Sequence, residues 1–253
     1  MGARTGSALE GRVALVTGGS RGIGAATARA LAAEGAAVAV SYLSSPDRAE
    51  EVVADIRATG SQAAAYEADQ ADSQQVTGLV DTVVADFGRL DILVNNAAHY
   101  TTGVLVDPDR DQAAFDRQLT ANVAGVGAAV RAAARHLGDG GRVVTVGSHL
   151  SSRAGFPGVA DYAATKAAVI GYSKGAARDL APRGITVNVV QPGSVATDMN
   201  PDDGPFADVQ RAANAMGRFG RPEEIAAGVV FLAGPAASFV TGTVLTIDGG
   251  YLA

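Results

Sequence analysis

The chain has 253 residues, 47% of them hydrophobic and 18% charged, which is enough to bury a full core within one α/β domain. Its net charge of −6 argues against nucleic-acid and anionic-membrane binding, since both require a basic face. It has no cysteine, and its three histidines lack ligand spacing, so we expect no disulfide, no thiolate nucleophile and no metal site.

The first ten residues carry no strand or helix pattern, and we predict a flexible tail there, followed by one domain over residues 11–253. The tail lacks the apolar core that a signal peptide needs. The longest apolar run, Ile225–Gly234, is too short to cross a bilayer. We therefore expect a cytoplasmic protein without membrane contact.

Beyond the tail, short β-branched runs alternate with alanine-rich stretches. Strands are predicted at Val13–Thr17, Ala37–Tyr42, Gln62–Tyr66, Ile92–Asn95, Arg142–Gly147, Ile185–Gln191 and Val244–Ile247. Helices are predicted at Ile23–Glu34, Asp47–Ala58, Ser73–Phe87, Gln112–His136, Tyr162–Ala181 and Pro222–Ala233. The strands read as continuous apolar runs, which is typical of strands buried on both faces. The alternation predicts a single doubly wound (Rossmann) α/β domain with a parallel sheet of about seven strands.

A glycine-rich turn joins the first predicted strand to the first predicted helix, with the spacing G-x3-G-x-G. Glycines let the backbone approach a ligand closely, and the start of a helix presents free N–H groups to a pyrophosphate. A tight turn needs glycine even without a ligand, but the strand before it and the helix after it favour a dinucleotide cofactor. The predicted contacts in this turn are Gly18, Ser20, Arg21, Gly22, Ile23 and Gly24.

The end of the second predicted strand decides between NAD and NADP. An acidic residue there would bind the adenosine ribose of NAD, but this chain has Tyr42, Leu43 and Ser44 instead. Arg21 can pair with a 2′-phosphate and Ser44 can donate a hydrogen bond to it, while Tyr42 lies beside them. We predict NADP(H) as the cofactor; the alternative is that Arg21 is a solvated turn residue.

Only two lysines occur in the chain, Lys166 and Lys174, and Lys166 follows Tyr162 by one helical turn. Bringing the pKa of a tyrosine from near 10 to near 7 requires roughly 4 kcal/mol, which a nearby ammonium in a water-poor cleft can supply. This pair predicts a proton-transferring phenol. Gly171–Gly175 also fits G-x-S-x-G, but it lies inside a predicted helix and no histidine follows His149, which excludes a hydrolase triad.

Three further polar residues lie near these motifs. Asn95 ends a strand, and its amide suits a contact along the cofactor. Asn122 lies within an apolar helix, where an amide needs partners; a purely structural role is the alternative. Ser148 ends another strand, where its hydroxyl suits a hydrogen bond to a substrate carbonyl.

The motifs TGGSRGIG, NNAA, YAATK and QPGSVATDM, together with Asn122 and Ser148, resemble in their order the short-chain dehydrogenase/reductase family. The resemblance runs from Gly11 to Gly250 and is greatest to the 3-oxoacyl-carrier-protein reductase-like branch. It implies that Tyr162 is the general acid/base, that Lys166 lowers its pKa and binds the ribose, that Ser148 polarises the carbonyl and that Asn122 holds a water. The resemblance also implies a homotetramer. Its further implied cofactor contacts are Asp69 at the adenine, Thr197 at the nicotinamide amide, and Ala97, Pro192, Gly193 and Val195.

Two departures from the family pattern matter. The usual NNAG reads NNAA here, which adds a methyl group at Ala98 near the cofactor. The spacing between Ser148 and Tyr162 is fourteen, often one shorter in the family, which leaves Ser151 or Ser152 as alternatives for the serine role.

We expect NADPH-dependent reduction of a ketone or 3-oxoacyl-type carbonyl to a secondary alcohol. Oxidation of an alcohol and a non-catalytic, dinucleotide-binding regulatory role stay open. The insertion Pro201–Gly220 predicts a lid at about residues 199–217. The substrate is a small carbonyl compound, free or bound to a carrier protein that would need a basic patch. Candidate patch residues are Arg131, Arg135, Arg178 and Arg183, and candidate substrate contacts are His99, His149, Phe156 and Ser194.

Overall fold

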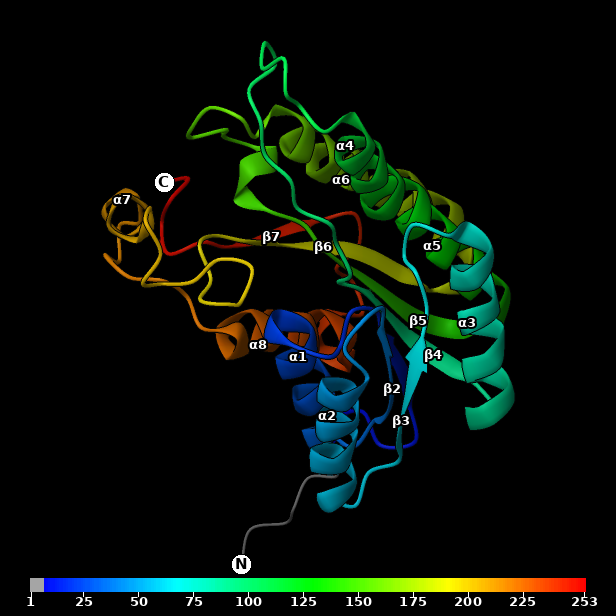
Figure 1. The fold of residues 1–253 in the computed structure, drawn as a ribbon. Helices are drawn as coiled ribbons and strands as arrows, with labels where there is room; N and C mark the ends of the chain where they lie inside the picture. The colour runs from blue at the N-terminus through cyan, green and yellow to red at the C-terminus, as the bar shows by residue number, and fades with distance from the viewer. Residues whose placement is uncertain (1–6) are drawn as a thin grey trace, which may run out of the picture.

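The computed structural model describes residues 7–253 and contains one parallel sheet of seven strands in the order β3-β2-β1-β4-β5-β6-β7 (Figure 1). The predicted single doubly wound domain is therefore confirmed. The strands are β1 Val13–Val16, β2 Ala37–Tyr42, β3 Ala63–Glu67, β4 Leu90–Asn95, β5 Leu137–Val146, β6 Thr186–Pro192 and β7 Val244–Ile247. The α-helices are α1 Gly22–Ala33, α2 Pro46–Ala58, α3 Ser73–Phe87, α4 Gln112–Leu119, α5 Val126–His136, α6 Ala160–Leu180, α7 Ala207–Ala213 and α8 Pro222–Ala233.

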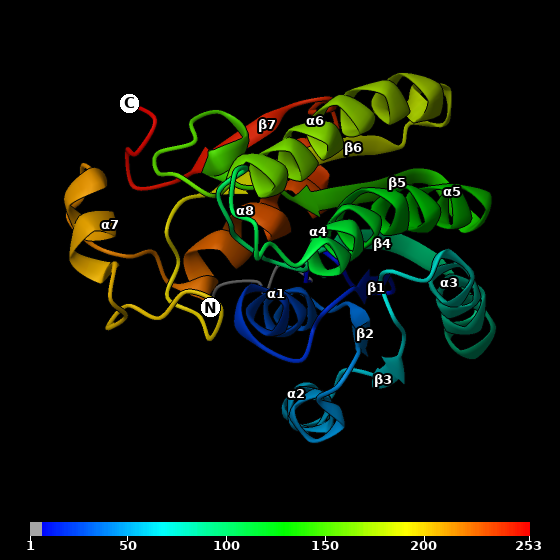
Figure 2. The same ribbon diagram turned by 45° about the horizontal axis from the view of Figure 1, so that its top comes forward.

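Helices cover both faces of the sheet. Successive side chains of a strand point to opposite faces, so each strand contributes to two separate cores. In β1, Ala14 and Val16 join the core formed with α1, α2 and α8. Val13 and Leu15 join the second core, formed with α3, α5 and α6. Figures 1 and 2 show these two helical layers on either side of the strands. Burial on both sides explains why the strands read as unbroken apolar runs.

The site is positioned by the reversal of strand order beside β1. The chain moves outward from β1 to β3 and then returns to pair β4 with the other edge of β1, for example Val16 with Val94. Ligands bind in such sheets at the carboxyl ends of the strands where the order reverses. This places the turn after β1 next to the segment after β4.

Two predicted elements are corrected. The helix predicted over Gln112–His136 is divided by a π-helical turn, Thr120–Gly125, which carries Asn122. The backbone is tightly packed there, since a methyl group on Gly125 would lie 2.0 Å from the Gln70 carbonyl oxygen. Strand β5 begins at Leu137, five residues before the predicted start, and its register against β4 shifts between Leu137 and Arg142.

The predicted amino-terminal tail is also corrected in part. Its first six residues lie outside the described residues. Leu9, however, is buried in the core beneath α1, and its N–H donates to the Glu34 carbonyl at 2.8 Å. An apolar side chain with a core site explains why this part of the chain is fixed.

The predicted lid contains the short helix α7, which stands apart from the two helical layers in both views (Figures 1 and 2). After β7, the last residues pack against the segment that follows β5. The Tyr251 ring lies 4.3 Å from the His149 ring, and Arg153 donates to the Tyr251 carbonyl at 3.4 Å. Across residues 7–253, none of the helices combines the length and apolarity needed to traverse a bilayer.

Candidate active site

The turn after β1 has the form that a pyrophosphate requires. Gly18 has φ +63, and a methyl group there would lie 2.9 Å from Cα of Ala97. A methyl group on Gly24 would lie 2.3 Å from the Gly18 carbonyl oxygen. Among residues 7–253, no side chain caps the first N–H groups of α1, and the first turn of this helix has no acid. The residues therefore fit a bound pyrophosphate, with free N–H donors and room for close approach.

Residues after β4 brace this turn. The Thr17 hydroxyl accepts hydrogen bonds from the N–H groups of Asn96 at 3.0 Å and Ala97 at 3.1 Å. The Asn96 amide donates to the carbonyls of Thr17 at 2.9 Å and Gly18 at 3.0 Å. Asn95 points into the sheet, where its amide donates to the Thr145 hydroxyl at 3.3 Å. Its predicted cofactor contact stays a prediction, while Thr17 is a supporting residue to which no motif points.

We expect Gly24→Ala to weaken NADPH binding at least tenfold, because the added methyl group meets backbone that cannot move without opening the turn. NADPH fluorescence titration measures this. Gly78→Ala on the exposed side of α3 is the matched control, since a methyl group there meets nothing within 4 Å. Equal affinities for the two variants would contradict this account of the turn.

The predicted catalytic side chains meet at the start of α6. Lys166 is 5% exposed, and its Nζ donates to the Val146 carbonyl at 2.9 Å and lies 5.7 Å from the centre of the Tyr162 ring. Burial lowers the pKa of Lys166 to about 8. Burial, followed by the neighbouring Tyr100, raises the pKa of Tyr162, and a hydrogen bond from Ser148 opposes this.

These values correct one expectation. The sequence predicts that the ammonium of Lys166 brings the pKa of Tyr162 toward 7. In the structure, burial holds this pKa above its ordinary value. The reason is that loss of water disfavours the phenolate, and the ammonium is held by the Val146 carbonyl. At pH 7 the site therefore holds a neutral phenol beside a protonated lysine.

Asn122 serves the site through the segment after β4. Its side-chain oxygen accepts from the His99 N–H at 2.8 Å, and its amide donates to the His99 carbonyl at 2.9 Å. The same amide donates to the Thr165 hydroxyl at 3.2 Å. This fixes the residue before Tyr100, whose ring meets the Tyr162 ring edge-on at 4.8 Å. The water-holding role of Asn122 stays a prediction.

The serine alternatives separate clearly in the structure. Ser148 is the serine that acts on the pKa of Tyr162. Ser151 donates to the Ser148 carbonyl at 2.7 Å, and Ser152 accepts from the Gln191 amide at 2.9 Å. Both of these hydroxyls are engaged in local structure, so the geometry favours Ser148. The G-x-S-x-G pattern, by contrast, lies inside α6, where no nucleophile elbow can form.

The segment after β6 reaches the glycine turn. A methyl group on Gly22 would lie 3.2 Å from the Thr197 methyl, and one on Gly193 would lie 2.7 Å from Cα of Asp248. Pro192 ends β6, and Val195 forms a bridge with Gly220. Thr197 therefore lies beside the glycine turn, while the cofactor contacts of Pro192, Gly193, Val195 and Thr197 stay predictions.

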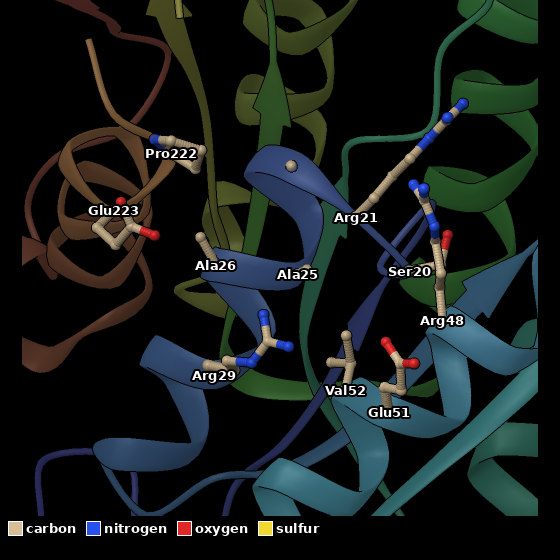
Figure 3. Close-up of a pocket in the computed structure, with 11 residues that line it drawn as sticks. Ser20, Arg21, Ala25, Ala26, Arg29, Arg48, Glu51, Val52, Pro222 and Glu223 are labelled. Atoms are coloured by element: carbon tan, nitrogen blue, oxygen red, sulfur yellow. The ribbon is translucent and has the colours of Figure 1, made fainter. Parts of the chain in front are cut away.

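After β3, the Asp69 carboxylate accepts hydrogen bonds from Arg117 at 2.9 and 3.0 Å and from the Ala71 N–H at 2.8 Å. Its adenine contact stays a prediction. Ser44 is exposed and Tyr42 partly so, at the end of β2. A cavity beside the turn is lined by Ser20 and Arg21 and by residues of α1, α2 and α8, among them Arg48, which the motifs did not reveal (Figure 3).

The four candidate substrate residues differ in their exposure. His149 is 7% exposed, its Nδ1 lies 3.1 Å from the Pro192 carbonyl, and burial lowers its pKa, so it packs as a neutral core residue. Ser194 is also buried. His99 is partly exposed behind Tyr100, and Phe156 is exposed on the loop before α6.

A family model described as enoyl-(acyl carrier protein) reductase matches residues 18–252. The 3-oxoacyl-[acyl-carrier-protein] reductase of Synechocystis sp. is 42% identical over 249 residues, covering 96% of this chain and 98% of that protein. The cyclic-di-GMP-binding biofilm dispersal mediator protein of Escherichia coli is 43% identical over 244 residues, with 96% and 98% covered. A solved short chain dehydrogenase from Burkholderia cenocepacia in complex with NADP is 53% identical, with a TM-score of 0.95 and 97% and 100% covered. The chain thus belongs to the short-chain dehydrogenase/reductase family and resembles within it the 3-oxoacyl-carrier-protein reductases.

Proposed function

We propose that the protein reduces a ketone or 3-oxoacyl-type carbonyl to a secondary alcohol with NADPH, and that Tyr162 is the general acid. The supporting observation is that a protonated Lys166, a neutral Tyr162 and the Ser148 hydroxyl converge beside a turn that fits a pyrophosphate. NADP(H) is the cofactor, in keeping with the NADP-bound Burkholderia relative and with the absence of an acid at Tyr42–Ser45.

When bound, NADPH supplies a hydride to the carbonyl carbon. Ser148 accepts from the Leu150 N–H at 3.2 Å, and its own hydrogen, which is directed at Tyr162 in the free site, can turn to the carbonyl oxygen of a bound substrate. Tyr162 donates to the same oxygen and transfers its proton as negative charge develops there. Lys166 then stabilises the phenolate that remains. A general acid must begin with its proton, and the raised pKa of Tyr162 keeps this phenol protonated at neutral pH.

We infer that the substrate is an uncharged ketone with apolar substituents. Leu105 and Val106, on the loop that follows Tyr100, are 72% and 90% exposed. Phe206 and Val209 on the lid are each 70% exposed. Apolar side chains that project from both segments suit an apolar ligand rather than a charged one.

A carrier-bound substrate has less support. Arg178 and Tyr162 both lie on α6, and a rise of 1.5 Å per residue separates them by about 24 Å along the helix axis. Arg183 donates to the Ala134 carbonyl at 2.7 Å, and Arg135 lies 3.8 Å from Asp81. Arg178 is thus remote from the phenol, and Arg183 and Arg135 are engaged locally, which favours a free substrate.

The test is NADPH oxidation with a panel of free ketones and with 3-oxoacyl groups on a carrier protein. We expect turnover of apolar free ketones, with kcat/KM no higher for carrier-bound compounds. Absence of NADPH oxidation with every carbonyl would contradict the proposal. A second candidate function is ligand binding without catalysis, because one relative is named as a cyclic-di-GMP-binding protein. Calorimetric titration with cyclic-di-GMP would detect such binding. The homotetramer stays a prediction.

We expect Ser148→Ala to lower kcat about 10²–10³-fold, because it removes one donor to the developing oxyanion. Ser151→Ala and Ser152→Ala remove hydroxyls that serve local structure and are expected to keep most activity. Steady-state kinetics with one ketone compares the three variants. A larger loss for Ser151→Ala or Ser152→Ala than for Ser148→Ala would reassign the serine role.

A further inference from the structure

Two arginines from separate elements converge on one carboxylate beside the glycine turn. Arg21 lies in the turn itself, and Arg48 lies in the first turn of α2, just past the end of β2. Arg21 is 3.6 Å from Oδ2 of Asp198, and Arg48 donates to the same oxygen. Figure 3 shows the two guanidinium groups extending to the same side of the cavity. The carboxylate of Asp198 is thus an anion held between two cations.

The place of this cluster matches the cofactor end that distinguishes NADP from NAD. The residues that follow β2 meet the adenosine ribose in this fold, and here none of Tyr42–Ser45 is acidic. A third arginine of the cavity, Arg29, is already paired with Asp55 at 2.8 Å. Within residues 7–253, Arg21 and Arg48 form ion pairs with Asp198 alone. Another anion can therefore replace Asp198 as the partner of these two arginines.

A carboxylate and a phosphate are recognised by the same guanidinium geometry. We propose that Asp198 takes the place of the 2′-phosphate as the anionic partner of Arg21 and Arg48, so that it competes with NADP(H) but not with NAD(H) and sets the selectivity between them. A hydrogen bond from Arg48 is the main reason why the pKa of Asp198 lies below its ordinary value, so the competitor is charged at neutral pH.

The competition is of modest strength. The side chains of Asp198, Arg21 and Arg48 are each slightly more than half exposed, and ion pairs in water are weak. A 2′-phosphate carries more charge and more acceptor oxygens than a carboxylate, so it displaces Asp198. NAD(H) has a ribose hydroxyl instead and leaves the ion pairs intact. Asp198 also adjoins Thr197 at the base of the lid, so cofactor choice decides whether this base stays tied to α2.

The experiment is calorimetric titration of the intact protein with NADP⁺, NAD⁺ and 2′,5′-ADP at one fixed salt concentration. We expect Asp198→Asn to tighten NADP⁺ and 2′,5′-ADP about three- to fivefold and to leave NAD⁺ unchanged. Arg48→Gln should weaken NADP⁺ about tenfold, and Asp198→Asn should have a smaller effect in that background. Glu51→Gln is the matched control, because Glu51 lies in the same cavity and carries the same charge (Figure 3).

An unchanged NADP⁺ affinity in Asp198→Asn would overturn the proposal. So would an equal gain for NAD⁺, or an equal gain in Glu51→Gln, since either would reveal a general charge effect. The inference rests on NADP(H) as the cofactor, which the wild-type titration tests separately. It needs no turnover, so a failure of the proposed reaction would leave these results readable.

Discussion

Tyr162→Phe is expected to lower kcat for ketone reduction about 10²–10⁴-fold while the Kd of NADPH changes less than threefold. The phenol lies beside both Ser148 and Lys166 and carries the proton to be transferred, and the variant removes only its hydroxyl group. The ring keeps its edge-on contact with Tyr100, 4.8 Å between centroids, so the packing of the site is retained. Steady-state kinetics and NADPH fluorescence titration measure the two quantities.

Tyr172→Phe provides the control for the loss of a phenol hydroxyl from the same helix. Its hydroxyl donates to the Gly127 carbonyl at 3.3 Å, far along α6 from the site, so kcat should be nearly unchanged. If Tyr162→Phe kept more than a tenth of wild-type activity, another proton donor would have to be sought. If it lost NADPH binding in parallel with kcat, Tyr162 would be a binding residue rather than the acid.

Lys166→Met is expected to abolish most activity and at the same time to stabilise the fold. The activity should fall by about 10²-fold or more, because the phenolate left by proton transfer loses its ammonium. Burial lowers the pKa of Lys166 from 10.5 to about 8, a difference that corresponds to about 3 kcal/mol of unfavourable charge burial. Loss of the hydrogen bond to Val146 offsets about 1 kcal/mol. A net gain of about 2 kcal/mol in the free energy of unfolding is expected at pH 7.

The sign of the pH dependence follows from which state binds the proton. Between pH 8 and pH 10.5 the unfolded chain keeps the proton that the folded chain has lost, so wild-type stability from this group rises with pH. The advantage of Lys166→Met is therefore complete below pH 8, and it has disappeared by about pH 10, where the remaining charge penalty is no larger than the roughly 1 kcal/mol lost with the hydrogen bond to Val146. Denaturant unfolding at pH 7 and pH 10 measures it. Lys174→Met, an exposed change on the same helix, should show neither effect, and an advantage that grew with pH would refute the burial argument.

The parts of the site that depend on local spacing were predictable. Tyr162 and Lys166 share a helix face because they are one turn apart, and the glycines of the turn carry their own geometric requirement. The unbroken apolar strands likewise predicted a sheet covered on both faces.

The other parts depend on what surrounds each residue. The direction of the Tyr162 pKa depends on burial and on Tyr100, which no motif brings to α6. The π-helical turn at Asn122 has the same apolar pattern as an α-helix. Arg48 and Asp198 lie 150 residues apart in the chain, so their pairing requires the folded structure.

The contact between Tyr251 and His149 has a practical consequence for the choice of variants. The Tyr251 ring rests on His149, next to Ser148, and a methyl group on Gly155 would lie 1.8 Å from the Tyr251 hydroxyl. Variants made to probe the site should therefore keep Tyr251, because a change in this ring would be transmitted through His149 to the adjacent Ser148.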